Sequence, residues 1–232
     1  MTDTHALPRT LAHERTSAGR RHGLRHVLGP DAWSRLPEAV RERFADTTAA
    51  ASYAGAFEVV QASMLGRLFA WLGTLFGTPV APRAEGNVEA RVRVTPDKDG
   101  IVWEREYRWA DGSRDLVTST KVVTGEGQLI EKLPARLCMP LRTYEDGGVL
   151  HFVSRGYYFD LGLGFKLWLP WLFSPGVTHV EHIDLGHGWF RFTMCVTHPL
   201  FGTLFFQTGR FCAIEEPPPM MAPADTVRRA RS

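Results

Sequence analysis

Alternating aromatic and basic side chains mark one short stretch of the chain as a candidate binding site. Trp103, Arg105 and Tyr107 lie two residues apart within residues 101–108, so in a strand they share one face. On an inward face, Arg105 needs a carboxylate partner, because an unpaired buried charge is prohibitive. Glu131, surrounded by apolar neighbours, is the expected partner. Such a pair could bind a ligand carboxylate or carbonyl between aromatic walls, or it could serve only to hold the sheet together.

A histidine-rich run further along the chain is a second candidate site. It comprises His179, Glu181, His182 and Asp184. In a strand, His179 and Glu181 share one face, so a third metal ligand, such as His151 or His198, would have to come from another segment. The spacing matches no cupin metal motif, and we expect no metal. Two alternatives stay open: an acid–base pair of His179 and Glu181, or ordinary polar residues at a strand surface.

The most apolar segment, residues 161–173, interrupts the pattern of hairpins. Four of its large residues follow helical spacing, although Pro170 would break or kink a helix. Three interpretations stay open: a lid over an apolar cavity, a core segment that covers a sheet edge, or an anchor on a membrane surface. Lys166 is the only charge of the segment, which disfavours membrane contact. The aromatic residues expected to contact a ligand are Trp103, Tyr107, Tyr157, Trp168 and Trp171.

Signatures of nucleophilic, phosphoryl-transfer and dinucleotide chemistry are missing from the sequence, which has no GxGxxG, Walker, GxSxG or HExxH motif. We therefore expect no cofactor. If the protein is an enzyme, its acids, bases and oxyanion supports are expected to be Arg105, Glu131, His179 and Glu181. The sequence does not decide between catalysis and simple binding.

The elements that must position these residues are mostly strands. From residue 85 to residue 214, apolar and polar residues alternate with a period of two, and Gly-containing turn signals recur. About eight or nine antiparallel strands are expected. Such a meander curls into a barrel or half-barrel, because closure removes exposed edges. The expected fold class is α+β, with one amphipathic helix after Ser63 packed on the sheet and short helices near the N-terminus.

Composition and charge place the chain among globular domains. Of 232 residues, 44 % are hydrophobic and 22 % are charged. Residues 1–27 are expected to form a disordered basic arm, 28–214 a single barrel-like domain, and 215–232 a disordered Pro-rich tail. The net charge of +2, less +3 for the arm and zero for the tail, leaves −1 for the domain, so no nucleic-acid binding is expected.

Cysteine usage and hydropathy indicate a cytoplasmic location. Cys138, Cys195 and Cys212 are an odd set without metal or CxxC spacing, as is common for free thiols in a reducing compartment. The first 27 residues lack the apolar core of a signal peptide. No apolar stretch approaches the roughly 20 residues that a membrane-spanning helix needs.

Five segments in order resemble a bacterial family catalogued as domain of unknown function 4166 (DUF4166). They are Leu28-Gly-Pro-Asp followed by Leu36-Pro, Leu75-Phe-Gly-Thr-Pro79, Val102-Trp-Glu-Arg-Glu-Tyr107, Gly127-Gln-Leu-Ile-Glu131, and His198-Pro-Leu-Phe-Gly202 followed by Gly209-Arg-Phe211. The resemblance covers residues 27–214. Members often follow a nucleotide-binding reductase-like domain, which implies a small-molecule context, but the family brings no established activity. The chain departs from the family at Arg43-Phe-Ala, where members often carry a histidine.

Three functional hypotheses follow from these patterns. The first is a binding module that holds an apolar lipid, polyketide or terpenoid-like molecule inside the wrapped sheet, covered by residues 161–173. The second is a cofactor-independent enzyme of cyclase or isomerase type that acts in the same cavity. The third and weakest is an interaction partner of a reductase.

Overall fold

The computed structural model describes residues 23–45, 50–74, 83–98 and 100–215. Most of the predicted N-terminal arm and C-terminal tail therefore lies outside the described residues. The part of the arm that is described includes a helix, α1 (Leu24–Leu28), so regular structure begins before the predicted boundary at residue 28. Two further short helices, α2 (Pro30–Arg35) and α3 (Glu38–Arg43), confirm the expected helices near the N-terminus.

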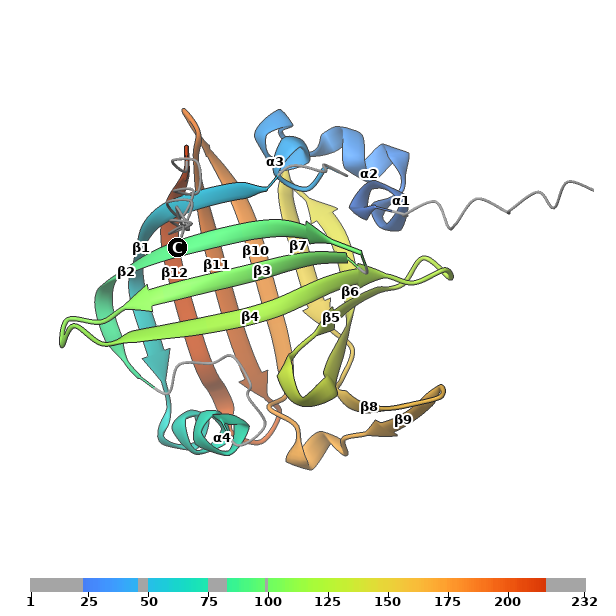
Figure 1. Ribbon diagram of the computed structural model, residues 1–232, viewed down its shortest axis with the longest axis vertical. Helices are drawn as coiled ribbons and strands as arrows, with labels where there is room; N and C mark the ends of the chain where they lie inside the picture. Colours follow the sequence, from blue (N-terminus) through green and yellow to red (C-terminus); the bar gives the residue numbers. More distant parts are fainter. Residues whose placement is uncertain (1–22, 46–49, 75–82, 99, 216–232) are drawn as a thin grey trace, which may run out of the picture.

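One antiparallel sheet closes into a barrel of ten strands and carries two outer strands (Figure 1). The barrel strands are β1 (Ala51–Ala62), β2 (Glu85–Asp97), β3 (Gly100–Arg108), β4 (Arg114–Val123), β5 (Leu129–Lys132), β6 (Leu137–Asp146), β7 (Val149–Ser154), β10 (Val177–Gly186), β11 (Trp189–His198) and β12 (Gly202–Ile214). They pair in this order, and β12 returns to β1. The outer hairpin, β8 (Tyr158–Gly162) and β9 (Phe165–Trp168), pairs with β6.

The predicted count of eight or nine strands was too low, and the difference arises in the apolar insert. The sequence of residues 149–159 predicts one continuous strand, but the strand is interrupted at Gly156, whose φ is +117°. The chain then leaves the barrel wall to form the β8–β9 hairpin and a 3₁₀ turn, η2 (Trp171–Phe173). The helical spacing of the insert was therefore misleading, because its large residues belong to a hairpin.

The alternation of apolar and charged side chains along each strand determines which face of the barrel wall is buried. In β2, Val88, Ala90, Val92 and Val94 are buried, and the charged residues between them face outward, as their period of two predicts. The seam between β1 and β12 depends on glycine: a Cβ at Gly55 would lie 1.9 Å from a carbonyl oxygen of β12. A glycine at this position thus permits close approach of the two strands.

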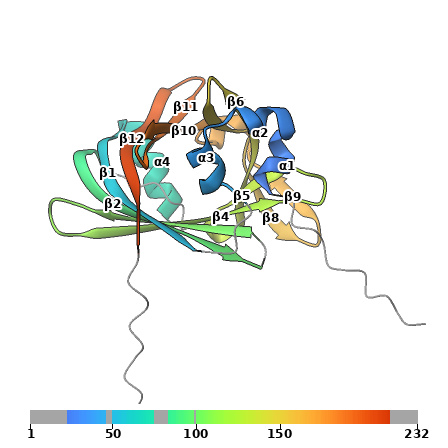
Figure 2. The ribbon, with the colours of Figure 1, turned by 90° about the horizontal axis from the view of Figure 1, so that it is seen from above.

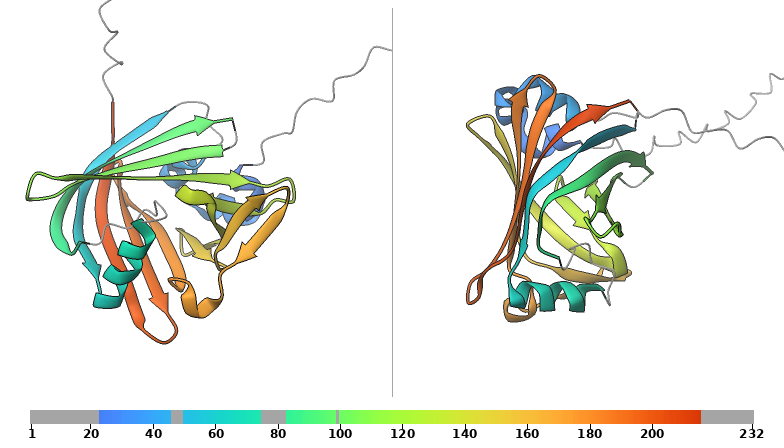
Figure 3. Two further views of the ribbon diagram at one scale, coloured as in Figure 1. Left: turned by 60° about the horizontal axis from the view of Figure 1, so that its bottom comes forward. Right: turned by 90° about the vertical axis from the view of Figure 1, so that its left-hand side faces the viewer.

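The two ends of the barrel are covered by different elements. Helices α1 to α3 lie at the end where β6 meets β7, and Figure 2 shows α3 over the opening. Val40 and Phe44 of this segment are buried against the barrel interior. The opposite end carries α4 (Met64–Thr74), η2 and the β8–β9 hairpin (Figure 3). None of the helices in the described part of the chain is long and apolar enough to cross a membrane.

Helix α4 begins as predicted but packs differently from the expectation. The hydroxyl of Ser63 accepts a hydrogen bond from the backbone N–H of Gly66 at 3.0 Å, which caps the helix. The helix lies across the end of the barrel, where Gly66 packs against Leu204 of β12 and Ala70 is buried. Leu65 and Leu68 are consequently exposed, although the helix was expected to pack its apolar face on the sheet.

Candidate functional site

The barrel encloses a cavity of about 530 Å³, within the size range of small-molecule sites. Side chains from most barrel strands line it, together with α4 and the segment that follows β9. Trp103, Arg105 and Tyr107 all line the cavity, so the face that they share in β3 is the inward one, which the sequence left open. Tyr157, just before β8, also lines it.

A charged cluster lies on the cavity wall formed by β3, β4 and β5. The Glu131 carboxylate lies 3.7 Å from Arg105 Nη2, which is the expected pair, but its nearest cation is Lys121, with Nζ at 3.1 Å. The hydroxyl of Ser119 donates a hydrogen bond to the same carboxylate oxygen at 2.7 Å. Two cations therefore share one buried anion, which leaves a surplus of one positive charge.

Burial and neighbouring charge act in opposite directions on these groups. Burial raises the pKa of Glu131, but the charges of Lys121 and Arg105 and the Ser119 hydrogen bond outweigh it and lower that pKa to about 2. Burial lowers the pKa of Lys121, and the charge of Glu131 opposes this shift. Glu131 is thus ionised at neutral pH, and a further anion near Lys121 would favour the charged form of this lysine.

Two polar atoms beside this cluster have no hydrogen-bond partner among the described residues. They are Nε1 of Trp103 and Nδ1 of His182, and both side chains line the cavity. The ring centroids of the two residues lie 6.1 Å apart, and Phe44 packs against both rings. Buried polar atoms normally find a partner, so an unpaired donor beside a cavity is typical of a site that a polar ligand group completes.

Two other polar pairs in the cavity wall are already satisfied. Tyr107 donates a hydrogen bond from its hydroxyl to the side-chain oxygen of Gln207 at 3.2 Å, and the hydroxyls of Tyr157 and Thr178 lie 2.7 Å apart. Burial raises the pKa of Tyr157 to about 12, so its phenol stays protonated. The aromatic faces of these tyrosines are available as apolar walls, but their hydroxyls are occupied.

The end of the cavity near α4 is apolar. Phe69 of α4 lines it, together with Leu169 and Phe173 from the insert. Trp168 and Trp171, which we expected to contact a ligand, do not line the cavity and are more than half exposed. Side chains alternate along β9, which directs the Trp168 ring outward, and the tight η2 turn does the same for Trp171. Leu169, which lies between them, turns inward.

The histidine-rich run divides between the two faces of β10. Thr178, Val180 and His182 line the cavity, whereas His179 and Glu181 lie on the outer face of the barrel. The expectation that His179 and Glu181 act as an acid–base pair inside the cavity is therefore wrong, because the period of two places them on the other side of the wall. His182 is the member of the run that reaches the cavity.

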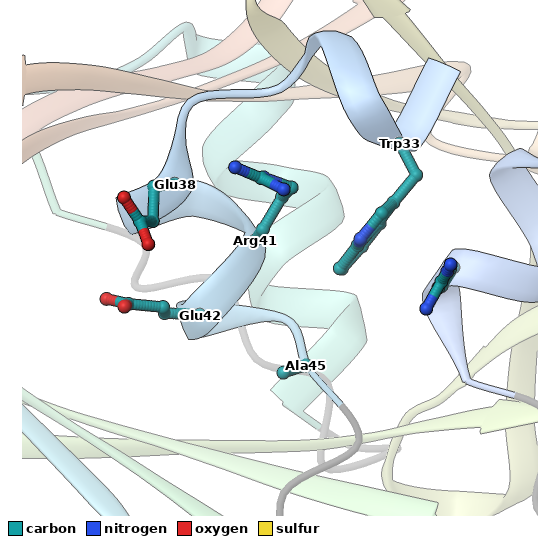
Figure 4. Close-up of a pocket in the computed structure, with 6 residues that line it drawn as sticks. Trp33, Glu38, Arg41, Glu42 and Ala45 are labelled. Atoms are coloured by element: carbon teal, nitrogen blue, oxygen red, sulfur yellow. The ribbon is translucent and has the colours of Figure 1, made fainter. Parts of the chain in front are cut away.

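A second hollow of about 410 Å³ lies outside the barrel among the N-terminal helices. Figure 4 shows Trp33 and Arg41 beside this hollow, whereas Glu38 and Glu42 point away from Trp33. The hollow is open, lined by groups of both charge signs, and contains none of the residues singled out from the sequence. The enclosed cavity in the barrel is the better candidate site.

Sequence reasoning missed Lys121, Ser119 and His182: Lys121 and His182 line the cavity, and Ser119 donates a hydrogen bond to Glu131 in its wall. A signal for the first two was present, because Val117, Ser119 and Lys121 alternate with outward-facing residues, and the cross-strand partner of Ser119 is Trp103. Residues opposite an inward-facing tryptophan must also face inward. Only strand register, which the sequence leaves open, shows that this lysine lies beside Glu131.

Comparison with known proteins gives one result. A family model described as Domain of unknown function (DUF4166) matches residues 36–211, which include nearly all of the barrel, so the chain belongs to this family. The match confirms the resemblance carried by the five sequence segments. No match was found among the curated proteins or the solved structures.

Proposed function

We propose that this member of the DUF4166 family binds an apolar small molecule with an anionic or carbonyl head group inside its barrel. The observation that carries the proposal is the surplus positive charge in a mainly apolar cavity, where Arg105 and Lys121 share Glu131 as their one carboxylate partner among the described residues. A ligand carboxylate would compensate this charge. Lipids, polyketides and terpenoid acids all combine such a head with an apolar body.

The geometry supports one orientation of the ligand. The head group lies near Lys121, where the N–H of Trp103 provides a further donor for a carboxylate or carbonyl oxygen. The apolar body extends past Tyr107 and Tyr157 towards Leu169 and α4. Burial of this body supplies most of the binding free energy, at about 25 cal/mol for each Å² removed from water.

A matched series of ligands tests the proposal. Delipidated protein is titrated with hexadecanoic acid, hexadecanol and hexadecane, and the affinity of each is measured by displacement of a fluorescent apolar probe. We expect one site per chain and tightest binding of the acid, because only its carboxylate compensates Arg105 and Lys121. Equal affinities would contradict the role of the charged cluster, and failure of all three ligands to bind would contradict the apolar site.

A cofactor-independent cyclase or isomerase acting in the same cavity is the second candidate. It is favoured by the unpaired Nδ1 of His182 next to the cations, because a base and an oxyanion support side by side are what proton transfer beside a carbonyl requires. Once a ligand is identified, the test is its conversion: loss of turnover in His182→Phe with retained binding would favour the enzyme, and no turnover by the wild type would exclude it.

We place this binding in the cytoplasm. The three cysteines are all unpaired, including Cys138, which is buried in the barrel wall. Free thiols are typical of a reducing compartment. Fluorescence microscopy of the tagged protein, or cell fractionation, tests this location.

A further inference from the structure

The outer face of the barrel brings three metal-ligand side chains together where β7 meets β10. His151 Nδ1 lies 3.0 Å from His179 Nε2 and 3.6 Å from a carboxylate oxygen of Glu181. His179 Nε2 lies 3.8 Å from the same oxygen. Strand register produces this arrangement: His151 and Glu181 are cross-strand partners, and His179 precedes Glu181 by two residues on the same face.

We propose that His151, His179 and Glu181 bind a divalent transition-metal ion, with Zn²⁺ the best fit. Ligand atoms about 2.0–2.2 Å from a tetrahedral zinc lie roughly 3.4 Å from one another, close to the three separations found here. Two imidazole nitrogens and one carboxylate oxygen suit zinc, cobalt or nickel and leave a fourth position for water. The separations already present mean that little rearrangement is needed.

The surroundings of the cluster favour a metal over a simple ion pair. Glu181 forms no ion pair with lysine or arginine in the described part of the chain; its partners within 4 Å are the two histidines. The ring of Tyr144 stacks on His151 with centroids 4.6 Å apart, which fixes the imidazole plane.

The position of the site suggests what a bound metal does. The ladder between β7 and β10 consists of four residue pairs, whereas β10 and β11 pair along most of their length. The chain also leaves the barrel between these strands to form the β8–β9 hairpin. A metal held by β7 on one side and β10 on the other clamps this short seam, whose inner face carries Phe152 and His182 of the cavity wall.

The test is zinc binding by tag-free protein stripped with a chelator, measured by competition with a chromophoric indicator. Wild type is compared with His179→Gln, Glu181→Gln and the control His187→Asn, which removes an exposed histidine in a turn. The N-terminal arm also contains histidines, so the result is the difference between wild type and each variant. We expect both cluster variants to lose one equivalent, or to bind it roughly a hundredfold more weakly, and the control to retain it.

A second readout separates a metal site from loss of structure. Zinc should raise the thermal unfolding midpoint of wild type and His187→Asn but not that of Glu181→Gln, because only the intact cluster clamps the seam. Co²⁺ should give visible bands typical of four- or five-coordinate nitrogen and oxygen ligands. Zinc binding equal in wild type and both cluster variants, or no zinc-dependent stabilisation of wild type, would overturn the proposal.

An independent observation concerns the end of the barrel near α4. Three separate segments expose large apolar side chains there: α4, the insert, and the β11–β12 turn (Figure 3). We call the following six residues the apolar collar: Met64, Leu68, Phe165, Trp168, Trp171 and Phe201. Single exposed apolar residues are ordinary, but a group of this size on one end marks an interaction surface.

The charges around the apolar collar indicate what it meets. Arg67 and Lys166 are exposed within it, and the neighbouring Asp160 is paired with Arg136 at 3.8 Å. The collar is also continuous with the apolar lining of the cavity through Phe69 and Phe173. Tryptophan rings flanked by basic residues are typical of side chains at the boundary between lipid head groups and acyl chains.

We propose that the apolar collar docks on the surface of an anionic lipid bilayer, from which the cavity takes its ligand. The source of the ligand rests on the proposed function, whereas docking itself does not. The sequence disfavoured membrane contact because the insert has a single charge. The structure adds the exposed face of α4 with Arg67, and both segments lie at the same end.

Vesicle flotation tests this docking, using phosphatidylcholine vesicles with and without phosphatidylglycerol. We expect wild type to float with anionic vesicles and Trp168→Ser/Trp171→Ser to lose at least tenfold in affinity. The control Trp189→Ser removes an exposed tryptophan at the opposite end of β11 and should bind normally. No flotation, or sedimentation showing that the collar mediates self-association or reductase binding instead, would overturn the proposal, whatever the ligand titrations show.

Discussion

Lys121 Nζ lies 3.1 Å from Glu131 Oε1 inside the barrel, where Arg105 also faces the same carboxylate. One anion between two cations is an incomplete arrangement for a buried site, because the second cation gains little compensation. An apolar cavity with one uncompensated cation selects for ligands that carry an anion or a polarisable carbonyl. The cavity therefore specifies a class of ligand even though the sequence contains no catalytic motif.

Replacing Lys121 by methionine should weaken binding of an apolar acid more than binding of the matching alcohol. The lost charge-assisted hydrogen bond is worth about 1.5–3 kcal/mol, or roughly a tenfold to hundredfold loss in affinity for the acid. Displacement titration of both ligands measures the difference. Lys132→Met, at the exposed end of β5, is the matched control and should bind like wild type. A uniform loss for acid and alcohol would mean that Lys121 acts only through packing.

The stability of the ligand-free protein should depend on Glu131 in acid. Its pKa is lowered from 4.5 to about 2 on folding, so the unfolded chain binds more protons between these values. The ionised carboxylate contributes roughly 3 kcal/mol to the free energy of unfolding. This contribution is complete above about pH 4.5 and is lost as the pH falls towards 2. The free energy of unfolding, measured by urea titration at each pH from 6 to 2.5, should fall less steeply with decreasing pH for Glu131→Gln than for wild type.

Two comparisons make that experiment decisive. Glu131→Gln should also be less stable than wild type at pH 7, by about 3–5 kcal/mol, because Lys121 and Arg105 lose their partner. Glu126→Gln, in an exposed turn, should show the same pH dependence of the unfolding free energy as wild type. Identical slopes for wild type and Glu131→Gln would show that the carboxylate titrates normally in the folded protein.

Gly66 is a position where one methyl group should disturb the end of the barrel. A Cβ there would lie 1.9 Å from the carbonyl oxygen of Leu204, so Gly66→Ala must displace α4 from β12. We expect increased hydrogen exchange of α4 amides and faster ligand release. Gly125→Ala, where a Cβ meets no atom within 4 Å, is the control and should change neither. Unchanged exchange in Gly66→Ala would show that α4 does not cover the cavity.

Filling the cavity should abolish binding while leaving the barrel folded. Ala70 lines the cavity from α4 and is buried, so a tryptophan at this position would occupy part of the apolar end. Leu116→Trp places the same ring on the exposed side of β4 and serves as the control. Probe displacement should be lost only in Ala70→Trp, with circular dichroism like that of wild type. Normal binding by a folded Ala70→Trp would place the ligand elsewhere.

The period of two predicted that Trp103, Arg105 and Tyr107 share one face of β3, and the need of a buried arginine for a carboxylate predicted its pairing with Glu131. It could not predict the face of β10, because Thr178, Val180 and His182 are hardly more apolar than His179 and Glu181. In that strand the barrel wall is set by neighbours on β7 and β11, and their register is a tertiary property.

The exposure of side chains in the apolar insert, residues 161–173, could not be predicted for a different reason. Trp168 and Trp171 were expected to contact a ligand, yet both are exposed, and Leu169 lines the cavity instead. A short hairpin attached to the barrel at only one edge cannot bury both of its faces. For the histidine-rich run, the sequence left His151 and His198 as alternative third ligands, and only strand pairing across the β8–β9 excursion shows that His151 is the one beside His179 and Glu181.

The most direct test of the central claim is native mass spectrometry of delipidated protein mixed with one equivalent of hexadecanoic acid, beside Ala70→Trp. We predict a one-to-one complex with wild type, its loss in Ala70→Trp, and weaker complex formation in Lys121→Met. A wild-type spectrum that contains only free protein with the acid, the alcohol and the alkane alike would contradict the assignment of the cavity as a ligand site.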